Sequence, residues 1–307
     1  MRQIAAKQKN KMMSLARNVN NEDSSAIISS YKLFQGIELI CYDMKQKQYI
    51  EPETNGPKHL YIDYCFDGRI EYKDSGKFHY LSDGDLALSQ RDIFEGSRYY
   101  PLGHFKGISI KLDLNLAPSD MSVFFDGINV KPEELCNKFC KEKGFYIIRE
   151  NQGVKNIFAG YRNVPKGMRD GFFRLKVLEL MLFLNNTEPQ KTLIEANPIG
   201  RVKLAKDAGT YMSERMDQKI TVNELAAHFH VSQTQLKNCF KAVYGMSVHA
   251  YIREQKMKAA AVMLKETDVP VLEIAGKYGF DNGSKFAKAF KDVMGTTPKV
   301  YRDIKNA

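Results

Sequence analysis

The strongest constraint on the fold is an internal repeat near the C-terminal end of the 307-residue chain. The segment ELAAHF (224–229) recurs as EIAGKY (273–278), forty-nine residues later. GMSVHAYIR (245–253) recurs as GTTPKVYR (295–302), fifty residues later. Three or more copies at such a period indicate a solenoid, whereas two copies indicate a pair of functional units.

Each copy predicts a short helix, a tight turn and a second helix. The first helix covers residues 222–229 in one copy and 271–278 in the other, and Gly279 supplies the left-handed residue that such a turn uses. Ser232 and Asn282 are placed to cap the second helices, because their side chains accept hydrogen bonds from backbone N–H groups. Each second helix is apolar on one face and polar and basic on the other. This pattern predicts two helix-turn-helix units.

The segment that joins the two copies predicts one continuous helix. VHAYIREQKMKAAAVMLKE (248–266) contains three consecutive alanines and neither glycine nor proline. About eighteen helical residues span ~27 Å. Such a helix holds the two units at a spacing that suits successive major-groove faces, which lie about 34 Å apart on one side of a DNA duplex.

Residues 219–302 resemble the DNA-binding domain of the AraC/XylS family of bacterial transcription regulators. The resemblance rests on the first copy of the repeat, on KMKAAAVML in the joining helix, and on I-A-x-x-x-G-F…F…F-K…G-x-x-P…Y-R in residues 274–302. It implies sequence-specific binding to double-stranded promoter DNA, more often activating than repressing. It also implies a homodimer, a contact with RNA polymerase and an N-terminal domain that senses a small-molecule effector, here unidentified.

The second helix of each unit is expected to enter the major groove. In the first unit the outward positions are Gln233, Thr234, Lys237, Asn238 and Lys241. The family pattern places Thr234, Lys237 and Asn238 toward bases and Lys241 toward phosphate, and lysine and asparagine suit guanine and adenine edges.

In the second unit the matching positions are Ser284, Lys285 and Lys288, with Lys291 toward phosphate. Gly283 stands where some relatives carry a long polar residue. We therefore expect the second unit to read fewer bases and to contribute more contacts to the DNA backbone.

Charge and hydropathy agree with a DNA partner for the C-terminal third. Residues 201–307 hold 18 Lys and Arg and 11 Asp and Glu, so +7 of the formal net charge of +10 lies there. The sequence contains no run of eighteen or more apolar residues, so it predicts no membrane-spanning helix. Residues 1–21 are basic and polar, unlike a signal peptide, so we expect a cytoplasmic protein without a membrane partner.

The predicted fold class is an α+β multidomain chain. Residues 1–30 are read as a polar tail, 31–115 as a β-rich, cupin-like barrel that binds the effector, 116–216 as a helical linker and dimerisation region, and 217–307 as an all-α double helix-turn-helix domain. The barrel prediction rests on short alternating segments such as LYIDYCF (60–66), with Asp67-Gly68 read as a hairpin turn.

The segment DGFFRLKVLELMLFLNN (170–186) predicts a helix that is apolar on almost every side. Such a helix has to be buried all round. Two interpretations remain open at this stage. The helix is either a core element under the barrel, or part of its surface is the homodimer interface.

Function in the N-terminal half is less specified by sequence. Tyr61, Tyr64, Phe66, Tyr72 and Phe94 are candidates for an effector pocket, and the alternative is that they simply fill the interior. His59, His79 and His104 show no H-x-H spacing, and no catalytic, P-loop or dinucleotide motif occurs, so we expect neither a metal site, nor a cofactor, nor an enzyme. The alternatives are an effector-independent or architectural DNA-binding protein and, last, an enzyme with a DNA-binding tail.

Overall fold

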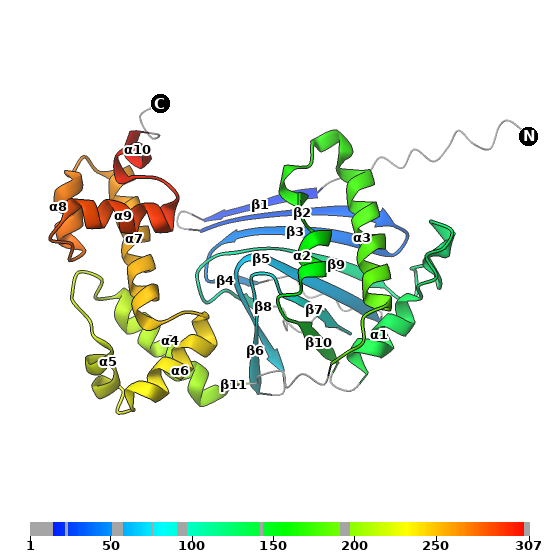
Figure 1. Cartoon of the computed structure of the whole chain (residues 1–307), viewed down its shortest axis with the longest axis horizontal. Helices are drawn as coiled ribbons and strands as arrows, with labels where there is room; N and C mark the ends of the chain where they lie inside the picture. The colour runs from blue at the N-terminus through cyan, green and yellow to red at the C-terminus, as the bar shows by residue number, and fades with distance from the viewer. Residues whose placement is uncertain are drawn as a thin grey trace, which may run out of the picture. The chain divides into compact units, whose positions relative to one another are not determined.

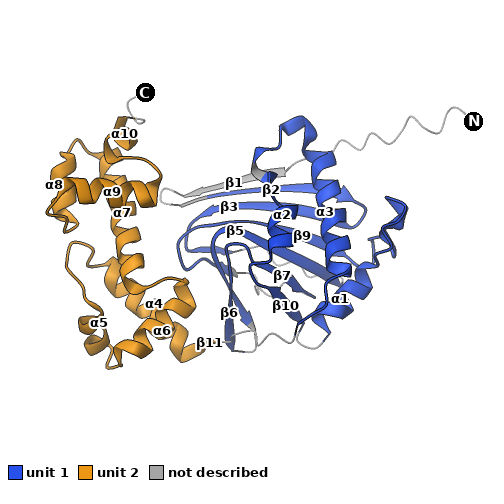
Figure 2. Cartoon of the chain, viewed as in Figure 1, with its two compact units in different colours: residues 1–196 blue, residues 197–307 orange. Residues whose placement is uncertain are grey.

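The computed structural model describes residues 15–21, 24–50, 58–74, 76–90, 97–141, 144–190 and 197–303. The chain divides into two compact units, residues 1–196 and residues 197–307 (Figure 2). The N-terminal unit is rich in β-strands and the C-terminal unit is helical (Figure 1). The α+β class with an all-α C-terminal part is therefore confirmed.

A large antiparallel sheet dominates the N-terminal unit. Paired strands run in the order β1-β2-β3-β9-β5-β6, β7 also pairs with β5 and carries β10 on its other side, and β8 pairs with β4 and with β5. The strands are β1 (Leu15–Asn21), β2 (Ser24–Phe34), β3 (Ile37–Lys45), β4 (Gln48–Ile50), β5 (His59–Asp74), β6 (Lys77–Ser82), β7 (Leu86–Ser89), β8 (Ser97–Tyr99), β9 (Phe105–Asp113) and β10 (Phe145–Ile148).

Strand β5 corrects the prediction of a hairpin at Asp67-Gly68. Residues 59–74 form one strand, and Gly68 takes its positive φ of 87° next to a register shift between Cys65 and Asp67. Because an irregular residue of this kind bends a strand, β5 pairs with β9 and β7 in its first half and with β6 and β8 in its second half. Gly68 does adopt a positive φ, but it lies at a bend within one strand and not at a chain reversal.

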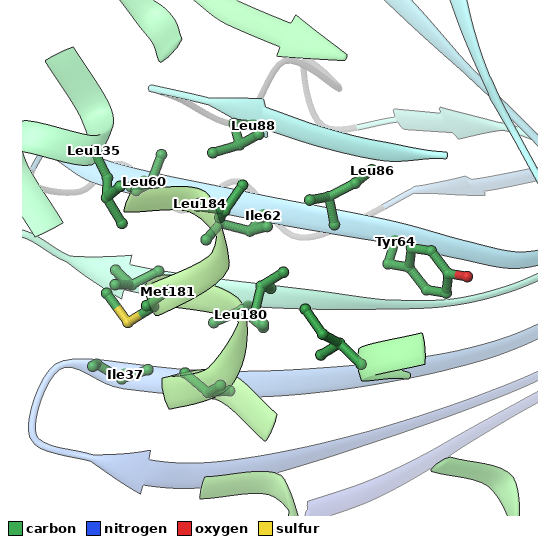
Figure 3. Close-up of a cluster of buried hydrophobic side chains, with 14 of the residues drawn as sticks. Ile37, Leu60, Ile62, Tyr64, Leu86, Leu88, Leu135, Leu180, Met181 and Leu184 are labelled. Atoms are coloured by element: carbon green, nitrogen blue, oxygen red, sulfur yellow. The ribbon is translucent and has the colours of Figure 1, made fainter. Parts of the chain in front are cut away.

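Three helices cover one face of this sheet: α1 (Pro132–Cys140), α2 (Gln152–Ile157) and α3 (Arg169–Asn185) (Figure 1). Leu180, Met181 and Leu184 of α3 lie in one buried cluster with Leu60 and Ile62 of β5 (Figure 3). Burial of each such side chain stabilises the fold by about 1.5–3 kcal/mol relative to exposure. A second buried cluster lies elsewhere in the unit and gathers Tyr42, Cys65, Tyr72, Tyr100 and Phe105 among its members.

The sheet is open, so the closed cupin-like barrel is not confirmed. In the described part of the chain β1 pairs only with β2, and no pairing returns from it to the opposite edge. The helices α1 to α3 offer a physical reason, because they bury a sheet face that a barrel would have to bury by closing on itself.

The N-terminal tail predicted for residues 1–30 contains strands in the structure. β1 pairs with β2 from Leu15 opposite Ser30 to Asn21 opposite Ser24. This segment carries few apolar residues, so its alternation is too weak to predict a strand. Backbone hydrogen bonds to β2, which do not depend on side-chain type, account for its conformation.

The C-terminal unit begins with β11 (Asn197–Pro198) and continues with seven helices in its described residues. They are α4 (Ile199–Ser213), α5 (Val222–His228), α6 (Gln233–Tyr244), α7 (Val248–Glu266), α8 (Val271–Lys277), α9 (Gly283–Met294) and α10 (Pro298–Asp303). The helix predicted for 248–266 matches α7 end to end. Among the described helices, none has both the length and the apolar character needed to cross a membrane.

Candidate nucleic-acid interface

The first helix-turn-helix, formed by α5 and α6, starts with a capping box. Thr221 Oγ1 accepts a hydrogen bond from the Glu224 N–H at 3.2 Å, and Glu224 Oε2 accepts one from the Thr221 N–H at 2.8 Å. These bonds satisfy two N–H groups that a helix start otherwise leaves without partners, and the charge-stabilising bonds hold the pKa of Glu224 below its usual value.

The turn after α5 requires a left-handed residue, and His230 supplies it with a φ of 53°. The Val231 N–H donates to the Ala226 carbonyl at 3.0 Å, which closes the turn. Ser232 then caps α6 by accepting from the Gln235 N–H at 3.1 Å. The chain therefore enters α6 at a fixed angle to α5.

Helix α6 has one buried face and one exposed face. Leu236, Cys239, Phe240 and Val243 are buried. The five residues predicted to touch DNA, which are Gln233, Thr234, Lys237, Asn238 and Lys241, are all exposed. The Gln233 side-chain amide also donates to Asn223 Oδ1 of α5 at 3.2 Å.

The second helix-turn-helix, formed by α8 and α9, repeats this geometry with different residues. Pro270 precedes α8 and provides no side-chain cap. Gly279 takes the left-handed position with a φ of 80°, and the Phe280 N–H donates to the Ala275 carbonyl at 3.0 Å. Asn282 Oδ1 caps α9 by accepting from the N–H groups of Ser284 and Lys285.

The exposed face of α9 carries the four predicted residues Ser284, Lys285, Lys288 and Lys291. Its buried face consists of Phe286, Ala289 and Phe290. Both second helices end at a left-handed glycine, Gly245 or Gly295. The structure thus places every predicted DNA-contacting residue on the solvent-exposed face of a second helix.

The sequence predicts a helix over residues 197–216 but assigns it to the helical linker, whereas the structure makes this helix, α4, part of the C-terminal unit. It packs along α6, and a Cβ on Gly209 would collide with the Tyr244 hydroxyl and lie 2.9 Å from its Cζ. Val202, Ala205, Ala208 and Met212 are buried on the same helix. This spacing of three to four residues is the signal that could have predicted the packing.

The four effector-pocket candidates that the structure describes lie in different surroundings. Tyr64 and Phe66 lie among the aromatic rings of the helix-covered core, with the Tyr64 and Phe158 rings stacked at 4.5 Å. Tyr72 belongs to the second buried cluster, and Tyr61 has the Lys111 ammonium 5.8 Å from its ring centroid. Phe94 lies outside the described residues.

His59, His79 and His104 also remain apart from any metal-binding arrangement. No group of three or more His, Cys, Asp or Glu side chains in the described ranges is arranged to hold a metal ion. The His59 ring lies 4.0 Å from a carboxylate oxygen of Asp113, and the His104 ring lies 3.8 Å from one of Asp67.

Comparison with known proteins places the likeness in the C-terminal unit. Residues 225–304 match a family model described as a helix-turn-helix domain. The right origin-binding protein of Escherichia coli strain K12 is 34% identical over 99 residues, which cover 32% of this chain and 34% of that protein. The match therefore spans about a third of that relative's length.

Two shorter relatives are covered more completely. The HTH-type transcriptional activator AarP of Providencia stuartii is 32% identical over 92 residues, which are 30% of this chain and 68% of that protein. The transposon Tn10 TetD protein of Escherichia coli is 33% identical over 97 residues, 32% of this chain and 70% of that protein. Most of the length of these two relatives thus corresponds to the helical unit.

Proposed function

Because the chain belongs to the AraC/XylS family, we propose that it is a transcription regulator that binds double-stranded promoter DNA in a sequence-specific manner. The observation that carries the proposal is the pair of capped second helices, α6 and α9, whose exposed faces hold all nine predicted contact residues. A helix of this kind fits the major groove, where base edges differ between all four base pairs.

The two units are proposed to divide the work of recognition. Thr234, Lys237 and Asn238 read bases, while Lys241 contacts phosphate. On α9, Ser284, Lys285 and Lys288 occupy the matching positions and Lys291 contacts phosphate. Since Gly283 has no side chain to read with, the second unit contributes more backbone affinity than sequence discrimination.

The test is a selection from randomised duplexes, followed by anisotropy titrations of the full chain at fixed salt. We expect a recovered site to be preferred over scrambled DNA by about 10³-fold or more. Equal and strongly salt-dependent binding to both DNAs would contradict the proposal, because it indicates phosphate contacts alone. That result would favour the architectural alternative.

We further propose that α3 forms a homodimer interface. One face of the helix is buried in the core, but Leu175 and Leu182 on another face are 66% and 40% exposed. Sedimentation of the full chain should show a dimer that Leu175→Glu weakens. Ile50→Glu is the matched control, because Ile50 is 73% exposed on β4 of the same unit. A variant that dimerises like the wild type would remove α3 from the interface.

The N-terminal unit is proposed to sense a small-molecule effector. Support comes from polar groups buried in its interior, such as Arg98, which is 3% exposed and lies 4.7 Å from the Tyr42 ring centroid. Burying a charge is unfavourable unless other groups compensate it, so we propose Arg98 as one candidate for contact with a polar effector. A thermal-shift screen of sugars, other metabolites and siderophores tests this. A compound that raises the melting temperature of the wild type should act less on Arg98→Met, and a screen without any shift would favour the effector-independent alternative.

Activation is the proposed outcome of DNA binding. It draws support from AarP, which is described as a transcriptional activator, and from the F1 operon positive regulatory protein of Yersinia pestis, 33% identical over 95 residues. A reporter gene placed behind a selected site should rise when the chain is expressed, through contact with RNA polymerase. A fall in the reporter would assign repression instead.

A further inference from the structure

A buried lysine connects the two helix-turn-helix units. Lys256 lies in the middle of α7 and is 9% exposed. Its ammonium donates one hydrogen bond to the Gln218 carbonyl at 3.2 Å and another to the Tyr278 carbonyl at 3.1 Å. Gln218 lies in the segment that leads into α5, and Tyr278 ends α8. One side chain therefore holds the backbone of both units.

We call the contact among Lys256, the segment before α5 and the end of α8 the junction, and it also includes an apolar contact. Met216, two residues before Gln218, packs against the buried cluster of α7, α8 and α9 that forms the core of the second helix-turn-helix. The segment between α4 and α5 thus packs against the core of the second unit through Met216, and it is tied to α7 through the hydrogen bond from Lys256. The units are joined by more than the helix between them.

The chemistry of the junction favours a fixed geometry. A buried ammonium needs hydrogen-bond acceptors, because an unsatisfied charge in the interior is strongly unfavourable. Backbone carbonyls at the end of α8 and ahead of α5 are acceptors whose positions are set by the fold. Burial lowers the pKa of Lys256, which agrees with a group withdrawn from water. Rotation of one unit against the other would break at least one of these two bonds.

We propose that Lys256 is a positioning residue that fixes the angle and distance between α6 and α9, and so sets the spacing of the two half-sites that the chain accepts. This inference rests on the proposed function. On B-DNA, insertion of one base pair moves the second half-site by about 3.4 Å and turns it by roughly 35°. A rigid pair of reading helices cannot follow that turn, whereas a loosened pair can.

The experiment uses the full chain and the duplex that the wild type selects. Anisotropy titrations compare this duplex with versions that have one base pair inserted or removed between the half-sites. We expect the wild type to lose at least about tenfold in affinity on either altered duplex, a loss comparable to one mismatched base pair. Lys256→Met should reduce the loss to about threefold or less, and Lys256→Arg, which keeps donors at this position, should restore most of it.

Two further variants complete the test. Lys258→Met makes the same substitution on the same helix, and its partner Glu254 lies one turn away on α7 at 2.7 Å, so it should keep the wild-type spacing penalty. Met216→Ala weakens the apolar side of the junction and should relax spacing by a smaller amount than Lys256→Met. This variant keeps the proposal testable if Lys256→Met does not fold.

The outcomes distinguish a failure of the proposed DNA-binding function from a failure of the role proposed for Lys256. If the wild type selects no preferred duplex, the proposed function fails. If it selects one and tolerates changed spacing, or if Lys256→Met keeps the full spacing penalty, only the role of Lys256 is overturned. Equal relaxation in Lys258→Met would also overturn it, because the effect would then follow from any lost charge on α7.

Discussion

The two helix-turn-helix units have nearly the same backbone but are held in place by different means. The first unit has a capping box at Thr221, a histidine in its left-handed turn position and α4 packed along its second helix. The second has a proline ahead of α8, a glycine in the turn and a core shared with α7 and α10. Conserving geometry thus does not require conserving the interaction that produces it.

The aromatic cores of the two helix-turn-helix units agree at two positions and differ at a third. Phe240 and Tyr251 of the first unit correspond to Phe290 and Tyr301 of the second, fifty residues later. The paired rings lie 5.2 Å and 5.4 Å apart, edge to face in both cases. Tyr244, which stacks on Phe240 at 4.3 Å, has Met294 as its counterpart. The core of the first unit is therefore more aromatic where α4 meets it.

The largest expected effect comes from removing the shared ring in either unit. Phe240→Ala and Phe290→Ala should each lower the free energy of unfolding by about 3–5 kcal/mol, because both side chains are fully buried and a cavity remains. Urea titrations followed by circular dichroism measure this. A loss below about 1 kcal/mol for one variant would show that the two cores are not equivalent.

A substitution at Gly209 tests the packing of α4 against α6 of the first unit. Gly209→Val should lower stability by about 1–3 kcal/mol, since the added atoms meet the Tyr244 ring, which is buried and stacked and cannot move aside freely. Gly200→Val on the same helix is the control, because a Cβ there has no neighbour within 4 Å. Equal effects of the two changes in thermal unfolding would contradict the packing of α4 described here.

Two substitutions at the left-handed turn position should change stability by smaller amounts and in opposite directions. Gly279→Ala places an L side chain at positive φ and should lower stability by about 1 kcal/mol. His230→Gly relieves that conformation in the first unit, and the gain should be under about 1 kcal/mol because glycine also loses more freedom on folding. Denaturant midpoints of the two variants check both signs. A stabilising Gly279→Ala would refute the backbone argument.

The capping box should contribute about 1 kcal/mol to the first unit and nothing to the second, which lacks it. Thr221→Ala removes the acceptor for the Glu224 N–H and is expected to cost about that amount. A chain in which this variant unfolds at the wild-type midpoint would exclude the box as a source of stability.

Glu224 adds a pH dependence with a defined sign. Its pKa is lowered in the folded chain, so its contribution is fully present above the ordinary glutamate value of about 4.3 and is lost as pH falls through the lowered folded value. Glu224→Gln should therefore flatten the fall in stability as pH drops below the ordinary glutamate pKa. Parallel profiles for variant and wild type would contradict this assignment.

Sequence reasoning reached the C-terminal unit more fully than the N-terminal one for a physical reason. Helix caps, left-handed turn residues and apolar periodicity are local signals, and residues such as Ser232, Gly279 and Asn282 keep their predicted roles in the structure. In the sheet, Gly68 gives the same local signal for a bend as for a hairpin, and only pairing with distant strands decides between them.

Interactions between elements far apart in sequence could not be predicted from the sequence. Nothing local marks Lys256 as a residue that bonds Gln218 and Tyr278, because it stands in a helix among other lysines. Nor does alternation along β5 reveal that Tyr64 and Tyr72 enter different buried clusters, since the register shift after Cys65 intervenes.

The most direct test of the central claim compares the two reading faces on one selected duplex, at fixed salt, with each base pair varied in turn. Lys237→Ala with Asn238→Ala should relax discrimination at one half-site by about 1–3 kcal/mol per base pair read, which is roughly 5- to 150-fold. Lys291→Ala in the second unit, which removes a proposed phosphate contact, should weaken binding nearly uniformly and reduce the salt slope by about one. Unchanged specificity in the double variant, or a base-specific loss in Lys291→Ala, would contradict the division of recognition between the two units.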